Sequence, residues 1–189
     1  LKWYRKAEEY YKRALFIREE KLGTYNFATA GSYNNLGLLY ELMGNYKEAE
    51  EYSQKALKIK LAVCGETNAS TAGSYNNLGD LYLAIKNYDK SLKYHNKALD
   101  IRVTVYGQTH CDTAISYNNI GEVYTAQENY CDAIDMFSNA FKIWKGKLEP
   151  SHPYVKNVLE LMKKIFPHTK YADSRSFETW ILDEFNYKI

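Results

Sequence analysis

The sequence predicts an all-α solenoid, a stack of antiparallel helix pairs with a concave groove, and an internal repeat is the main reason. Ser-Tyr-Asn-Asn-Leu-Gly occurs at Ser32–Gly37 and Ser74–Gly79, and Ser-Tyr-Asn-Asn-Ile-Gly occurs at Ser116–Gly121, at a constant step of 42 residues. A fixed step of this size is typical of proteins built from stacked supersecondary units. One unit cannot bury its apolar surface alone, so neighbouring units must stack for stability.

The first half of each unit has the pattern of an amphipathic helix. Tyrosine, leucine or isoleucine, and tyrosine stand at i, i+3 and i+7, beginning at Tyr33 in the first copy. This spacing places them on one helical face. A glycine inside such a helix costs about 1 kcal/mol against alanine, so we expect it to allow a close approach between helices. Gly79 should therefore contact the second helix of its unit, near Ser91 or Ala98.

Turn residues separate the predicted helices. The pairs Gly44-Asn45, Lys86-Asn87 and Glu128-Asn129 mark the turn between the two helices of each unit. Gly65 and Gly107 are placed to end second helices, and the polar residues that follow them can cap the next helix.

These signals predict a solenoid over residues 1–166. Its parts are the second helix of a truncated repeat (1–24), three repeats (29–65, 71–107 and 113–148) and a partial repeat (153–166) that Pro167 ends. Without a first helix before it, the initial segment should expose apolar residues such as Trp3, Tyr4 and Tyr10. We expect a partner or further residues of a longer parent chain at this edge, since the sequence does not begin with Met.

The tail, residues 167–189, departs from the repeat. Four apolar residues stand at i, i+3, i+4 and i+8 and predict an amphipathic helix: Phe177, Trp180, Ile181 and Phe185. Asp173 or Ser174 can cap its start. Two interpretations are open: a cap that covers the last repeat, or a segment whose tryptophan, set between acidic residues, mimics a ligand and occupies a groove.

Composition excludes several classes of function. The chain has 25 Lys and Arg against 23 Asp and Glu, a net charge of +2, so no strong positive field is available to hold nucleic acid. No apolar run approaches the roughly 18 residues that a membrane span needs, and the N-terminus lacks the apolar core of a signal peptide. We expect a soluble cytoplasmic protein.

No motif predicts catalysis. The four histidines lack the i, i+4 spacing of a helical zinc site, and there is no glycine-rich phosphate loop or nucleophile elbow. His110-Cys111-Asp112 comes nearest to a metal cluster, but we interpret it as a capping linker. The three cysteines, an odd number at irregular spacing, predict reduced side chains. We expect no enzyme activity, no cofactor and no metal.

The repeated strings resemble the tetratricopeptide repeat, whose pattern is an aromatic residue, Leu-Gly and Tyr in the first helix and two small residues in the second. The standard repeat is about 34 residues long. The longer unit, with Tyr-Asn-Asn-Leu-Gly and Ala-Leu-x-Ile strings and the linker Glu149–Pro153, is similar to the extended repeats of kinesin light chains. The resemblance covers Trp3 to Ile165 and implies a right-handed superhelix that binds protein partners.

In relatives the first helices line the concave face, and an Asn there often contacts a bound peptide. An Asn amide suits the main chain of an extended peptide because it both donates and accepts. The resemblance implies a groove made of Asn34, Asn35, Leu38, Glu41, Asn76, Asn77, Asp80, Leu83, Asn118, Asn119, Glu122 and Thr125. The alternative is that one Asn of each pair bonds a neighbouring helix and helps the stacking.

Two functions follow from these expectations. The first is a scaffold whose groove binds a protein or peptide partner, without nucleic acid or membrane. Because the groove lacks the Lys and Arg that hold acidic tails, it should favour neutral or basic peptides. The second is a structural role in which the solenoid spaces or oligomerises a larger protein, with self-association through the N-terminal end or the tail helix.

Overall fold

The computed structural model describes residues 2–188, and every regular element in this part of the chain is a helix. The contacts divide the chain into two compact units, residues 1–105 and 106–189. The predicted all-α repeat fold is confirmed.

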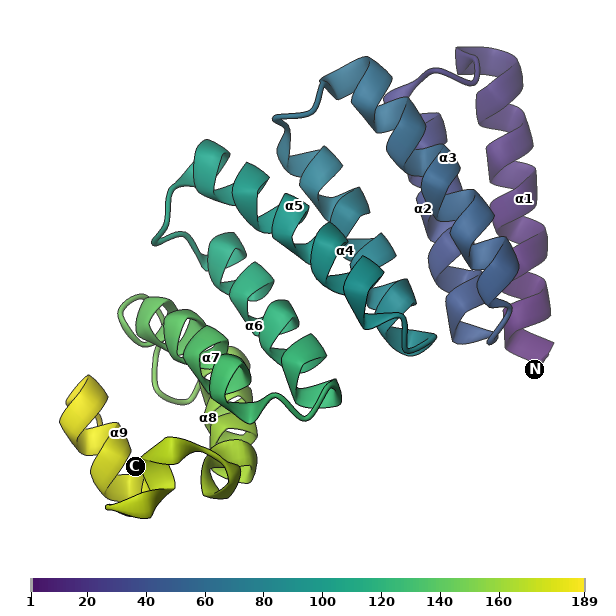
Figure 1. The fold of residues 1–189 in the computed structure, drawn as a ribbon. Coiled ribbons are helices and arrows are strands. Elements are labelled where there is room, and N and C mark those ends of the chain that lie inside the picture. Colours follow the sequence, from purple (N-terminus) through teal and green to yellow (C-terminus); the bar gives the residue numbers. More distant parts are fainter. Residues whose placement is uncertain (1, 189) are drawn as a thin grey trace. The chain divides into compact units, whose positions relative to one another are not determined.

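The first unit consists of five helices joined by short turns (Figure 1). They are α1 (Lys2–Leu22), α2 (Phe27–Leu42), α3 (Tyr46–Cys64), α4 (Ala69–Ala84) and α5 (Tyr88–Tyr106). Helix α2 contacts both α1 and α3, and α4 contacts both α3 and α2. Helices α2 and α4 are the first helices of two successive repeats, and they begin 42 residues apart.

The second unit continues the repeat and then adds the tail. Its helices are α6 (Cys111–Ala126), α7 (Tyr130–Lys145), α8 (Pro153–Ile165), the 3-10 turns η1 (Phe166–His168) and η2 (Lys170–Asp173), and α9 (Phe177–Phe185). Helix α6 begins 42 residues after α4. The sequence-predicted break at Pro167 falls in η1, directly after α8.

The same threonine-to-glycine hydrogen bond starts the first helices α2, α4 and α6. The hydroxyl of Thr71 donates to the carbonyl of Gly65 at 2.8 Å, and that of Thr113 donates to Gly107 at the same distance. Both glycines have positive φ, 81° and 88°, which glycine adopts without the steric cost that a Cβ brings. The backbone N–H of Asp112 donates to Nδ1 of His110 at 3.1 Å. The segment around His110 therefore acts as a capping linker, as the sequence indicated.

Tyrosine rings fill the space between the two helices of a pair. Tyr52 of α3 lies beside Tyr33 and Tyr40 of α2, with ring centroids 6.0 and 5.3 Å apart. The same arrangement recurs one repeat later, where Tyr94 of α5 stacks on Tyr82 at 5.4 Å. Aromatic pairs at this separation stabilise beyond their buried area by about 0.5–1.5 kcal/mol.

The glycine between these tyrosines permits the close approach. The hydroxyl of Ser91 donates to the carbonyl of Gly79 at 2.8 Å, which confirms the predicted contact. A Cβ at Gly79 would lie only 2.5 Å from the ring of His95. The equivalent Gly121 faces Phe137 in the second unit. A ring therefore occupies the space that the missing Cβ leaves.

The tail packs into the core of the second unit. Trp180 and Ile181 of α9 are buried in one cluster with Val158 and Met162 of α8. The helix is capped by Ser176, whose hydroxyl accepts from the backbone N–H of Thr179 at 3.2 Å. The sequence-based assignment of the cap to Asp173 or Ser174 is wrong, because the chain up to residue 173 forms the 3-10 turn η2.

Candidate binding surfaces

Eight of the sequence-predicted groove residues lie on α2 and α4 of the first unit, and we call this set the first-helix face. They are Asn34, Asn35, Leu38 and Glu41 on α2, and Asn76, Asn77, Asp80 and Leu83 on α4. The Nδ2 group of Asn77 donates to Oδ1 of Asn34 at 2.6 Å, so this amide pair joins successive first helices. For this pair the structure supports the stacking role that the sequence left open.

Other members of the first-helix face bond a side chain of their own helix or are exposed to solvent. Asn76 donates to Oδ2 of Asp80 at 2.9 Å, one turn further along α4. Asn35 and Leu38 are exposed, Leu38 by 37%. An exposed amide beside an exposed apolar side chain offers both a hydrogen-bonding and an apolar contact to a ligand.

The electrostatics of this face are neutral to acidic. Helices α2 and α4 contain no Lys or Arg. Burial raises the pKa of Glu41 above its ordinary value. Nε2 of His95 lies 3.6 Å from Oδ1 of Asp80, but burial, followed by the charge of Arg102, lowers the pKa of His95 to about 4. His95 is therefore neutral at pH 7, and the two residues form no ion pair there.

The remaining four predicted groove residues lie on α6, in the second unit. Asn118 is buried and donates to Oε1 of Glu122 at 2.8 Å, while Asn119 is half-buried. The hydroxyl of Thr125 donates to the carbonyl of Gly121 at 2.8 Å. Burial raises the pKa of Glu122, and the bond from Asn118 opposes this shift. These side chains repeat the amide-to-carboxylate bond that α4 makes.

Two repeat-equivalent cavities in the first unit were not predicted. One, of about 170 Å³, lies beside Tyr33, Lys55 and Ile59, and the other, of about 300 Å³, lies beside Tyr75, Lys97 and Ile101. Nζ of Lys55 is 5.8 Å from the ring centroid of Tyr33, and Nζ of Lys97 is 5.1 Å from that of Tyr75. These are cation–π distances. These cavities could have been predicted from the sequence, because Lys55 and Lys97 are 42 residues apart, as their tyrosine partners are.

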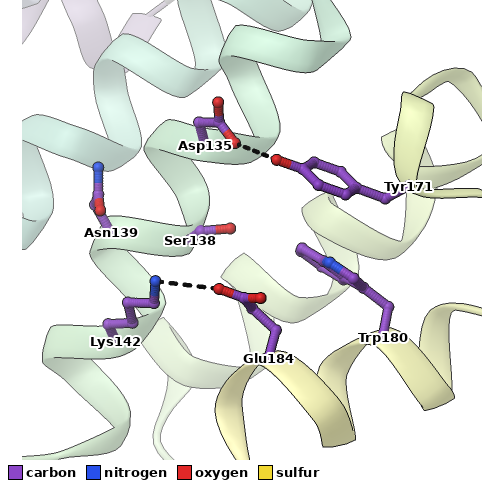
Figure 2. Close-up of a pocket in the computed structure, with 7 residues that line it drawn as sticks. All are labelled: Asp135, Ser138, Asn139, Lys142, Tyr171, Trp180 and Glu184. Atoms are coloured by element: carbon purple, nitrogen blue, oxygen red, sulfur yellow. Dashed lines mark hydrogen bonds and ion pairs between the residues drawn. The ribbon is translucent and has the colours of Figure 1, made fainter.

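A third cavity, of about 170 Å³, lies between α7 and the tail in the second unit (Figure 2). The hydroxyl of Tyr171 donates to Oδ1 of Asp135 at 3.1 Å, and Nζ of Lys142 lies 3.5 Å from Oε1 of Glu184. Burial and the Asp135 charge raise the pKa of Tyr171, so its hydroxyl stays protonated and donates. Because these polar groups bond one another, they connect the tail to α7.

Metal and membrane chemistry receive no support from the described part of the chain. Residues 2–188 contain no group of three or more His, Cys, Asp or Glu side chains that could hold a metal ion. No helix within the same residues is long and apolar enough to cross a membrane.

Helix pairs repeated at a fixed step, with a close contact to a glycine inside each pair, define an α-helical repeat protein. The chain belongs to the tetratricopeptide-repeat family, whose model matches residues 2–62, 28–102 and 70–145. The resemblance inferred from the repeated strings is therefore confirmed. A comparison with curated proteins finds no match.

Solved structures share the fold. BtubC (BKLC) from P. vanneervenii is 25% identical with a TM-score of 0.77, and the match covers 86% of this chain and 65% of BtubC. Kinesin light chain-like repeats from Podosopora anserina are 16% identical with a TM-score of 0.73, covering 86% of this chain and 77% of that one. The apo form of RapI is 20% identical with a TM-score of 0.69, over 88% and 62% of the two chains. The chain thus spans slightly less than two thirds of BtubC.

Proposed function

We propose that this chain is a non-catalytic scaffold that binds a peptide segment of a protein partner on the first-helix face. The exposed pair Asn35 and Leu38 carries the proposal, because it places a hydrogen-bonding amide next to an apolar contact on a helix with no basic residue. The family supports a protein partner, since tetratricopeptide repeats are stacked scaffolds with extended binding surfaces. Free Cys64, Cys111 and Cys131 are consistent with a cytoplasmic location.

The preferred ligand should be neutral or basic. Glu41 and Asp80 bear the charges of this face, and neither α2 nor α4 supplies a cation that could hold a carboxylate. Complementary charge speeds encounter, and like charge rejects wrong partners.

Selection from a random-peptide library, followed by calorimetry with the selected peptide, tests this function. Asn35→Ala should weaken binding because it removes an exposed amide of the face. Asn96→Ala removes an exposed amide from α5, a second helix, and should leave Kd unchanged. Equal effects of the two substitutions, or selection of strongly acidic peptides only, would argue against the proposed face.

A structural role is the second candidate, and exposed apolar side chains on α1 favour it. Trp3, Tyr10 and Phe16 are all more than half exposed. Apolar side chains gathered on one helix mark a contact surface. Light scattering over a range of protein concentrations would detect self-association through this helix.

A further inference from the structure

The two repeat-equivalent cavities of the first unit share a tyrosine, a lysine and an isoleucine but differ in charge. The first, which we call the α3 cavity, is lined by Thr24, Tyr25, Tyr33, Lys55, Lys58 and Ile59. The second, the α5 cavity, has Glu66 and Asp100 at the positions equivalent to Thr24 and Lys58, and Lys97 is the one cation among the described residues that line it. A carboxylate is therefore attracted to the α3 cavity and repelled by the α5 cavity.

The two lysines of the α3 cavity are available to a ligand. Nζ of Lys55 is 5.8 Å from the ring centroid of Tyr33 and 5.5 Å from that of Tyr52, so the two rings restrict its ammonium group. Lys58 lies one turn further along α3, on the same side of the helix. Within residues 2–188 neither lysine forms an ion pair with a carboxylate. A cation that is positioned before the ligand arrives reduces the entropy lost on binding.

The third repeat shows what a lysine at this position binds. Lys142 of α7 is the equivalent of Lys58, at the same 42-residue step. Its Nζ lies 3.5 Å from Oε1 of Glu184 (Figure 2) and 5.4 Å from the ring centroid of Phe185. This lysine thus contacts an acidic residue together with the aromatic residue that follows it in α9.

We propose that the α3 cavity binds a peptide segment of a protein partner through an acidic residue that precedes an aromatic one. The carboxylate accepts from the ammonium groups of Lys55 and Lys58, and such charge-assisted hydrogen bonds are stronger than neutral ones. The aromatic ring packs against Tyr25, which is 60% exposed. The cavity volume of about 170 Å³ admits a side chain, because one water in the liquid takes up only about 30 Å³.

The α3 cavity shares no residue with the first-helix face, so the inference does not rest on the proposed peptide-binding function. The α5 cavity lies one full repeat further along the chain, so a cavity at this position is a feature of the repeat itself. Lys58 and its equivalent Asp100 then decide which repeat accepts an acidic ligand.

A labelled peptide with the sequence of Phe177–Phe185 is the probe, because it contains Glu184 followed by Phe185. Fluorescence anisotropy with the intact chain gives the affinity. We expect saturable binding that Lys58→Asp weakens by about fivefold or more, since the substitution replaces attraction with repulsion. Lys47→Asp is the matched control, because Lys47 is exposed in the first turn of α3 and does not line the cavity. It should change Kd by less than about twofold.

The α5 cavity supplies a gain-of-function test. Glu66→Thr, Thr67→Tyr and Asp100→Lys together give it the residues of the α3 cavity. The triple variant should bind two probe molecules per chain in place of one, and calorimetry measures this stoichiometry. An unchanged stoichiometry would overturn the proposal.

Other outcomes would also overturn it. They are absence of binding by the probe, and equal losses from Lys58→Asp and Lys47→Asp. Loss of binding through Lys142→Asp or Asn35→Ala, with none through Lys58→Asp, would place the probe on α7 or on the first-helix face. A homodimer that Lys58→Asp abolishes would count against the proposal too, since the occupant would then be a second copy of this chain.

Discussion

Single residues decide how closely helices approach, and two glycines of α4 have opposite surroundings. A Cβ added at Gly79 would lie 2.5 Å from the ring of His95, whereas nothing lies within 4 Å of one added at Gly73. Gly79→Ala should therefore lower the free energy of unfolding by about 1–3 kcal/mol through overpacking. Gly73→Ala should raise it by about 0.5–1 kcal/mol through helix propensity. Urea denaturation measures both, and a loss of stability from each would contradict the packing described.

The buried imidazole of His95 makes stability depend on pH. Its pKa is lowered to about 4 in the fold, from an ordinary value of 6.5. The unfolded chain therefore takes up a proton at His95 below about pH 6.5, and the folded chain does not. The free energy of unfolding is thus at its full value above pH 6.5 and falls as the pH is lowered toward 4. The loss should reach about 2–4 kcal/mol.

His95→Phe is the matched variant for this pH dependence, because Phe137 faces Gly121 at the equivalent position. The variant should show a shallower decline in stability between pH 6.5 and pH 4 than the unmodified chain. Parallel curves of melting temperature against pH would show that the imidazole is not responsible.

Turn conformation gives a third residue-scale prediction. Gly44 has a φ of 75°, and Lys86, at the equivalent position one repeat later, has a φ of 59°. A side chain with a Cβ is strained in this left-handed region. Lys86→Gly should therefore raise the free energy of unfolding by about 0.5–1 kcal/mol after the entropy of glycine is subtracted. Gly44→Ala should lower it by a similar amount, and thermal melts of both variants would reveal the opposite signs.

At the scale of elements, α9 shows how the tail stabilises the second unit. Trp180 is 2% exposed and its ring centroid lies 5.3 Å from that of Phe166, so it is buried in the core. Trp180→Ala should cost about 3–5 kcal/mol. Leu182→Ala, two residues away on the exposed side of α9, should cost less than about 1 kcal/mol. A stable Trp180→Ala protein with stronger peptide binding would instead support an autoinhibitory tail.

The repeated strings were sufficient to predict the helices of the repeats. Once a helix is recognised in one repeat, the fixed step predicts the same helix at the equivalent residues of the other two. They could not assign the residue opposite the glycine, since Ser53, His95 and Phe137 share neither size nor polarity. Nor could they predict the left-handed conformation of Lys86, which the turn between two packed helices imposes on a residue that rarely adopts it.

The candidate site was less predictable than the fold. An Asn can bond a ligand or a neighbouring helix with the same amide, so the role of Asn34 depended on where Asn77 lay, 43 residues further along the chain. The tail had no repeat to compare with. The position of the α9 N-cap, Ser176, depends on the preceding 3-10 turn η2, whose four residues have no periodic pattern.

At the scale of the whole molecule, the net charge of +2 is too small to attract or repel a partner strongly over a long range. The charges on the binding face therefore determine which partner is preferred. Binding of a basic peptide to the first-helix face should weaken as salt is raised, because exposed charges are screened over about 10 Å at 0.1 M. It should also weaken as the pH falls, beginning above the usual range of a carboxylic acid, since burial raises the pKa of Glu41. Calorimetric titrations at two salt concentrations and at several pH values provide the measurement.

Glu41→Gln tests the origin of that dependence. Removing this charge should weaken binding of a basic peptide by about two- to fivefold, the usual effect of a partly exposed charge. Glu51→Gln, which removes an exposed carboxylate from α3, should leave the affinity unchanged. Binding that is insensitive to salt, with identical behaviour of the two variants, would contradict an electrostatic contribution from this face.

The constant step has a consequence for how such a chain can change its length. Asn45 and Asn87 precede equivalent second helices, and the hydroxyls of Tyr40 and Tyr82 meet equivalent carboxylates. A genetic event that removes or duplicates the segment between Asn45 and Asn87 joins a turn to an equivalent turn of the same backbone conformation. The helices that meet at the junction carry equivalent tyrosines, so the copy number of repeats can vary in a single event while the stacking of tyrosine rings within each helix pair is kept.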